Sequence, residues 1–119
     1  MRSSGAKQIR SFETGATRDA LGDKLVYEAF LSPVVLRRYA EYMHGHRQQT
    51  DGEVRAGDNW QRGMDIATYR DSLVRHVMDA WYVWRKGGKI DEAFEDLLCA
   101  IIFNASGYLF ELMRDRDDV

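Results

Sequence analysis

The stretch Leu97-Leu98-Cys99-Ala100-Ile101-Ile102-Phe103 decides the fold. It is the middle of a predicted helix that opens near Asp91 and continues to about Arg114, and it is apolar on every face. A helix of this kind is central and packs on all sides. Because the chain offers few other elements to cover it, we predict a homo-oligomer, with a dimer as the expected state, whose interface completes the core.

Two further helices are predicted before this one. The first starts at Ser32-Pro33, because serine can cap free amides and proline at the first helical position loses no hydrogen bond. It runs to about His46. The second is predicted to begin at the capping pattern Thr68-Tyr69-Arg70-Asp71 and to end at Gly87-Gly88. The polar stretch from 47 to 63 between them is predicted to be a loop, and loops of this length are often functional.

The remaining segment, residues 1–31, carries few helical signals and is interrupted by Gly5, Gly15 and Gly22. We predict an irregular N-terminal arm over 1–31 and a helical domain over 32–119. With 119 residues the chain has room for one modest core. The predicted fold is therefore an all-α, small helical bundle that forms a single domain overall.

Composition and charge narrow the class of protein. Hydrophobic residues make up 45% and charged residues 30%, which is typical of a soluble globular protein. A net charge of −2 argues against direct nucleic-acid binding. The apolar run from 97 to 103 is far shorter than the roughly 20 residues of a membrane helix, and the N-terminus lacks the apolar region of a signal peptide. We expect no membrane partner, a cytoplasmic location, and a reduced, buried Cys99.

Polar residues within the two later helices suggest a metal site. His76 and Asp79 are three apart and share a helix face. At the entrance to the apolar run, the later helix carries Glu92, Glu95 and Asp96 within about one turn. Carboxylates that meet across a helix interface suit Mg²⁺, which prefers oxygen ligands and keeps waters that substrate phosphates can replace.

Simpler interpretations stand beside this one. The acids of the later helix also suit its first turn, where negative charge meets the positive end of the helix dipole. His76 alone fits a core histidine bonded to a neighbour, and Asn104 fits a bond to another helix. Trp81 and Trp84 are expected in the core or in an interface.

The predicted loop contains Asp58-Asn59-Trp60-Gln61-Arg62-Gly63. An aromatic face beside amide and cationic donors can stack on a base and hold phosphate. The alternative is a turn anchored by a buried Trp60. His44 and His46 are two apart, do not share a helix face, and are assigned no role.

Several segments, in order and spacing, resemble the dATP/dGTP diphosphohydrolase family of phages, distant relatives of the MazG-type all-α nucleotide pyrophosphohydrolases. They are Thr14-Gly15-Ala16-Thr17-Arg18-Asp19, Gly22-Asp23-Lys24, Tyr27-Glu28, Leu31-Ser32-Pro33, Leu36-Arg37-Arg38, Ala40-Glu41, Gly57-Asp58-Asn59-Trp60-Gln61-Arg62-Gly63, Ser72-Leu73-Val74-Arg75-His76, and Glu95-Asp96 with Asn104. They span nearly all of the chain after the first dozen residues.

The resemblance implies a MazG-like helical fold and an enzyme that converts a purine deoxynucleoside triphosphate to its monophosphate and pyrophosphate. It implies Mg²⁺ or Mn²⁺ as cofactor and, for a phage protein, the host cytoplasm as location. The hypothesis that follows gives each candidate a role. Asp79, Glu92, Glu95 and Asp96 are the expected metal ligands, His76 joins Asp79, Glu95 and Asp96 as a catalytic residue, Lys24, Arg62 and Arg75 contact phosphate, and Asn59, Trp60 and Asn104 hold the base or sugar.

Two other classes of function remain open. The chain could be a non-catalytic module that keeps nucleotide affinity on the same scaffold. It could also be a structural oligomer or partner-docking protein, which predicts no metal-dependent change in melting temperature.

Overall fold

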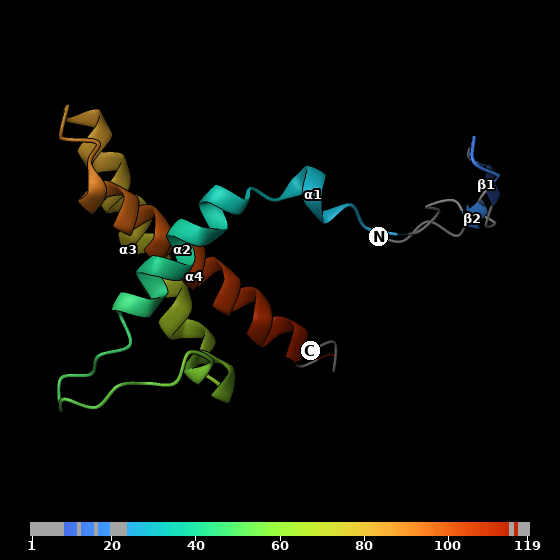
Figure 1. Ribbon diagram of the computed structural model, residues 1–119. Helices are drawn as coiled ribbons and strands as arrows, with labels where there is room; N and C mark the ends of the chain where they lie inside the picture. The colour runs from blue at the N-terminus through green and yellow to red at the C-terminus, as the bar shows by residue number, and fades with distance from the viewer. Residues whose placement is uncertain (1–8, 12, 16, 20–23, 115, 117–119) are drawn as a thin grey trace. The chain divides into compact units, whose positions relative to one another are not determined.

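The computed structural model describes residues 9–11, 13–15, 17–19, 24–114 and 116. The chain divides into two compact units, 1–33 and 34–119, close to the expected boundary between arm and helical domain. The described residues are mostly helical, which confirms the predicted all-α small bundle. Figure 1 shows the order of the elements along the chain.

The N-terminal unit is not wholly irregular, contrary to the prediction. β1 (Ile9–Ser11) pairs antiparallel with β2 (Thr17–Asp19), with Ile9 opposite Asp19. The connecting turn contains Gly15 at φ 87°, a conformation that glycine adopts without steric cost. The short helix α1 (Tyr27–Phe30) follows. Gly15, which indicated an irregular segment in the sequence, lies in the turn of a β-hairpin.

Three long helices build the second unit, as the sequence predicted. They are α2 (Pro33–Gly45), α3 (Ile66–Arg85) and α4 (Glu92–Arg114). Within the predicted loop, Asn59–Arg62 form a 3-10 turn, η1.

The start of α3 differs from the prediction. The N-cap is Asp65, whose side chain accepts a hydrogen bond from the amide of Ala67 at 3.2 Å, and not Thr68. An aspartate three residues upstream offered an equally good cap, and helix formation extends to the earlier one. At the other end, Gly87 (φ 71°) turns the chain towards α4.

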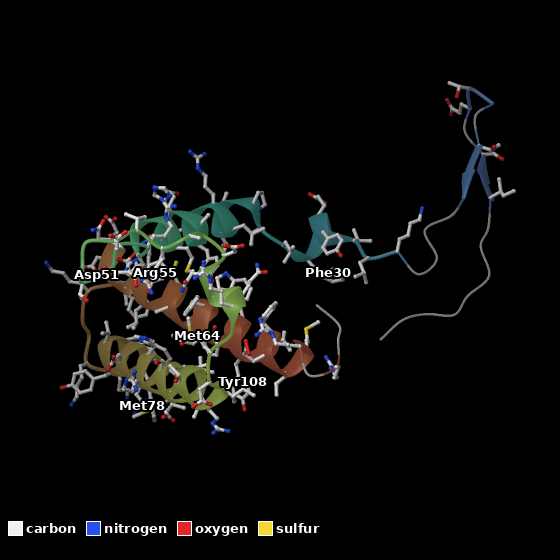
Figure 2. The ribbon with its side chains drawn as sticks, turned by 90° about the horizontal axis from the view of Figure 1, so that it is seen from below. Phe30, Asp51, Arg55, Met64, Met78 and Tyr108 are labelled. Atoms are coloured by element: carbon white, nitrogen blue, oxygen red, sulfur yellow. The ribbon has the colours of Figure 1, made fainter. Side chains whose placement is uncertain are left out.

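α3 and α4 pack against each other and hold the core of the unit. The buried apolar residues among those described are Tyr69, Ala80, Cys99 and Ala100, and Asn104 and Glu111 are buried polar residues. Burial raises the pKa of the Cys99 thiol, as expected for an inert interior cysteine. α2 lies on the other side of α4 from α3 in the view of Figure 2, tied to α4 by Arg38.

One chain leaves much apolar surface uncovered. α4 is long and apolar enough to cross a membrane when only length and composition are considered, and 28% of that window is buried within the chain. Trp81 and Trp84 of α3 are 48% and 60% exposed, so neither belongs to the core of this chain. The prediction that α4 is packed on all sides is therefore not met within one copy.

Candidate functional site

A cavity of about 280 Å³ lies within the second unit. Its walls come from α2, the long loop, η1, α3 and α4, so residues far apart in the sequence meet there. The lining residues are Tyr42, Met43, His46, Arg47, Arg55, Ala56, Gly57, Asn59, Trp60, Met64, Ser72, His76, Ala100, Phe103 and Asn104. Four of the residues proposed from sequence, Asn59, Trp60, His76 and Asn104, are thereby brought together.

The loop after α2 folds back on itself and positions two arginines. The amide of Arg55 donates to the carbonyl oxygen of Arg47 at 2.8 Å, and Gln48 forms an isolated bridge with Val54. The Arg55 guanidinium also donates to the carbonyls of His46 and Arg47. Figure 2 shows Arg55 in the loop beside α2. Arg55 thus closes the base of the loop and keeps Arg47 at the cavity wall.

η1 is held to α4 by aromatic and cationic contacts. The Trp60 ring meets the Phe110 ring edge-on at 4.7 Å between centroids. Arg114 lies 5.0 Å from the Phe110 centroid and donates to the carbonyl of Gln61. Trp60 is therefore packed against α4, although it is half-buried and not buried as the simpler interpretation expected, and it also lines the cavity. The two roles are compatible because Trp60 remains only half-buried when it packs on Phe110.

The opposite wall is formed by α3 and α4. The amide nitrogen of the buried Asn104 donates to the Ala100 carbonyl at 2.8 Å, one turn earlier on α4. His76 borders the cavity from α3, and its Nδ1 is buried with no hydrogen-bond partner among the described residues. A buried nitrogen without a hydrogen-bond partner lowers the stability of the fold, so a ligand or water that bonds Nδ1 of His76 would be favoured at this wall.

The two arginines that line the first cavity give it a positive charge. Arg47 and Arg55 border the cavity, and no carboxylate is among the lining residues. Neither arginine forms an ion pair in the described part of the chain. Burial raises the pKa of the Tyr42 phenol, which therefore stays neutral and able to donate at physiological pH. The cavity combines cationic, amide and aromatic groups and suits an anionic ligand that carries a flat ring.

A second cavity of about 490 Å³ adjoins the first. The two share Met43, Arg47, Gly57, Trp60 and Phe103 as lining residues. Arg47 therefore lies on both cavities, and a ligand longer than one of them can contact it from either side.

The acidic residues predicted to bind metal have a different partner. Arg38 of α2 donates to Glu95 Oε1 at 2.8 Å and to Asp96 Oδ1 at 2.7 Å. It also reaches the backbone carbonyl of Glu92 at 3.4 Å. Hydrogen bonds to Asp96 and Glu95 raise the pKa of Arg38, so the guanidinium keeps its charge. Two carboxylates that were expected to share a cation share this guanidinium.

The predicted convergence of acids is not seen in the described residues. No group of three His, Cys, Asp or Glu side chains there is arranged to hold a metal ion. Asp79 and Glu92 are exposed on their own helices. Because only Glu95 and Asp96 converge, and both bond to Arg38, this arrangement does not fit Mg²⁺ or Mn²⁺.

The predicted phosphate contacts lie outside the cavity lining. The Arg75 guanidinium donates to the hydroxyl of Ser72 at 3.0 Å, and Ser72 lines the first cavity whereas Arg75 does not. Arg62 is exposed at the end of η1. Lys24 belongs to the N-terminal unit and is exposed there.

Sequence reasoning overlooked the cationic residues of the loop. Arg47 and Arg55 flank Asp51-Gly52, a turn signal that brings their backbones together, and this signal could have identified them. His46 was assigned no role because it shares no helix face with His44. α2 ends at Gly45, so the helical argument does not apply to His46, which lines the first cavity.

Comparisons of the chain with protein-family models, with curated proteins and with solved structures found no match.

Proposed function

We propose that the chain is a purine deoxynucleoside triphosphate diphosphohydrolase, which converts dATP or dGTP to the monophosphate and pyrophosphate. The observation that carries this proposal is the cavity in which Trp60, Asn59 and Asn104 meet Arg47 and Arg55, with no carboxylate among the described lining residues. Aromatic and amide groups recognise a base, and guanidinium groups bind phosphate oxygens. The resemblance to phage diphosphohydrolases supplies the reaction.

The base and sugar occupy the first cavity in this proposal. Trp60 and Phe103 offer apolar ring faces, and the amides of Asn59 and Asn104 offer both donors and acceptors to a purine edge. A cavity of about 280 Å³ is at the lower end of the range of ligand sites, so it holds the nucleoside part and not the whole triphosphate.

The phosphates extend from the first cavity along Arg47. A guanidinium presents a planar fork of donors that matches phosphate oxygens, and Arg47 borders both cavities. The phosphate tail can therefore leave the nucleoside cavity while it remains in contact with the same arginine.

His76 is the proposed base. An imidazole at neutral pH can accept a proton from a water molecule. That water attacks the α-phosphorus, the bond from the α-phosphorus to the bridging oxygen breaks, pyrophosphate leaves with the bonding electron pair, and His76 takes the proton from the water. The unpartnered Nδ1 of His76 at the cavity wall supports this role, since substrate or water can satisfy it.

Mg²⁺ or Mn²⁺ remains the cofactor that the resemblance implies, and no step is derived through it. Glu95 and Asp96 are the acids that would hold such an ion if Arg38 released them, whereas Asp79 and Glu92 do not converge with them. Asp96 is one helical turn from Ala100, which lines the first cavity, so Asp96 is close to that cavity along α4. The contact with Arg38 would have to open for a cation to enter.

The decisive experiment is an assay of purified full-length protein with each of the four dNTPs, under Mg²⁺ and under Mn²⁺ separately. Monophosphate and pyrophosphate are followed independently. We expect equimolar release of both from dATP or dGTP, abolished in His76→Gln. Absence of turnover under both metals would refute the enzymatic proposal.

One observation favours a second candidate, a non-catalytic nucleotide-binding module. Arg38 is hydrogen-bonded to Glu95 and Asp96, the carboxylates that a metal ion would need, whereas the cavity is open to a ligand. Isothermal titration calorimetry separates the two functions, because a binding module would show affinity for dATP or dGTP without turnover, and Asp96→Ala would preserve that affinity.

A further inference from the structure

The second cavity differs in chemistry from the first. Its volume of about 490 Å³ exceeds the 280 Å³ of the first cavity and lies within the range of small-molecule sites. Tyr39, Trp60 and Phe103 present aromatic rings to it, and Met43 adds aliphatic surface. Among the described residues that line it, Arg47 supplies the guanidinium and there is no carboxylate. The second cavity is therefore large, rich in aromatic surface and weakly cationic.

The two cavities are neighbours along α4. The first is lined by Ala100, Phe103 and Asn104 of that helix, and the second by Phe103, Ser106 and Gly107. Each residue of the second set is three positions after one of the first set, which is about 4.5 Å along the helix axis. A ligand that fills the first cavity therefore needs only a short extension to enter the second.

A triphosphate tail is a poor match for the second cavity. The terminal phosphate of dATP carries about two negative charges at neutral pH, and apolar surroundings make such charges costly to desolvate. Arg47 contacts both cavities, and its Nε also donates to the His44 carbonyl at 3.5 Å. Arg55 lines the first cavity and not the second, and its guanidinium bonds backbone carbonyls. The phosphates are therefore best placed beside Arg47, with a neutral group beyond them.

We propose that the second cavity holds a second nucleoside, so that the whole site takes a dinucleoside polyphosphate, in which a chain of phosphates joins two nucleosides. Every phosphate in such a chain is a bridging group with about one negative charge. The doubly charged end of a nucleoside triphosphate is thereby replaced by a neutral nucleoside.

The lining residues fit both halves of this ligand. One base lies against Trp60 in the first cavity, the other lies against Tyr39 in the second, and Arg47 contacts the phosphates between them. Stacking on aromatic side chains is favourable for any base, because every base has a π face. The inference rests on the proposed nucleotide site and names the class of ligand that fills both of its cavities.

The test is isothermal titration calorimetry of the full chain with two ligands that differ only in the second nucleoside. They are dATP and di(deoxyadenosine) triphosphate, both as methylene-bridged analogues that resist hydrolysis. We expect the dinucleoside ligand to bind about tenfold or more tightly, because it adds one stacked base. Equal or weaker binding of the dinucleoside ligand, beside clear binding of the dATP analogue, would overturn this inference alone. Binding of neither ligand would overturn the proposed function as well.

Ser106→Trp fills the second cavity and should abolish the preference for the dinucleoside ligand. Ala105→Trp is the matched control. Ala105 is the preceding residue of α4, is exposed and lines neither cavity, so the preference should persist. Circular dichroism checks that each variant is folded.

Tyr39→Leu is a second variant, which removes a ring from the second cavity without filling it. We expect the preference for the dinucleoside ligand to fall several-fold, because one stacking surface is lost. A preference that survives both Ser106→Trp and Tyr39→Leu would place the second nucleoside elsewhere and overturn the proposal.

Discussion

The ring of Tyr69 on α3 lies directly against the backbone of Gly107 on α4. A Cβ placed on Gly107 would be 2.8 Å from Tyr69 Cδ1 and closer still to Cε1 and Cζ. Tyr69 is 1% exposed, and its ring also lies 5.8 Å from that of Phe103, a cavity-lining residue. This contact sets the closest approach of the two helices that hold the core.

Gly107→Ala should therefore destabilise the protein. The added methyl group has no room, and overpacking of this kind costs about 1–3 kcal/mol of unfolding free energy. Chemical denaturation measures the loss. Gly45→Ala at the end of α2 is the control, because a Cβ there meets nothing within 4 Å. Equal stability of the two variants would contradict the close packing of Tyr69 on Gly107.

Tyr69→Phe should stabilise the protein at neutral pH by about 1 kcal/mol. The Tyr69 hydroxyl is buried without a hydrogen-bond partner in the described residues, and removing an unpaired polar group relieves its desolvation cost. Thermal unfolding of both proteins checks the prediction. A loss of stability on removing the hydroxyl would mean that it has a partner.

Stability should also fall as the pH rises above about 10. Burial raises the pKa values of Tyr39, Tyr42 and Tyr69. The unfolded chain therefore releases these protons first, and the stabilisation present below the unfolded pKa is lost as pH rises through the folded one. Denaturation midpoints between pH 8 and about pH 11 measure the slope, which should be shallower in Tyr69→Phe. An unchanged slope in that variant would contradict the argument.

Arg38→Met should increase the response of the protein to divalent cations. The substitution removes the guanidinium from Glu95 and Asp96 and leaves two adjacent carboxylates. We expect millimolar Mn²⁺ to raise the melting temperature of Arg38→Met more than that of the wild type, because a ligand that binds only the folded state stabilises it. Arg37→Met, on the same helix, serves as the control. Equal shifts in all three proteins would rule out cation binding by this pair of acids.

Arg47→Gln should weaken dATP binding about tenfold or more, which corresponds to the loss of a charge-assisted hydrogen bond. Arg47 borders both cavities, whereas Arg37 lines neither, so Arg37→Gln is the matched control. Calorimetry with a non-hydrolysable dATP analogue provides the affinities. Unchanged affinity in Arg47→Gln would exclude this arginine as the phosphate contact.

Asn104→Leu should separate recognition from folding. Within the described part of the chain the Asn104 amide bonds its own helix alone, at Ala100, so an apolar side chain of similar volume should leave stability within about 1 kcal/mol of the wild type. Affinity for dATP and dGTP should fall, because the amide no longer reaches the base. A variant that unfolds, or one that binds both nucleotides normally, would contradict the assignment.

The sequence revealed part of the candidate site and missed the rest for identifiable reasons. Trp60 and Asn104 stood out because each has a side chain that needs a partner or a covering surface, and both line the cavity. Arg47 and Arg55 did not stand out, because arginines in a polar loop are common and only the folded loop places them at a wall. The helical period suggested that Asp79 faces the acids of α4. The period gives only the direction of a side chain around its own helix, and it does not give the distance from that side chain to residues of another helix.

By itself, the sequence determined the three long helices and the apolar character of α4, because the spacing of apolar residues and the glycines at the ends of helices are local properties of the chain. Only the tertiary structure decided that Arg38 bonds Glu95 and Asp96, and that the loop arginines meet Trp60 around one cavity. These pairings join residues more than fifty positions apart or cross between elements, and the packing of α2 and the loop on α4 selects them from many partners of similar chemistry.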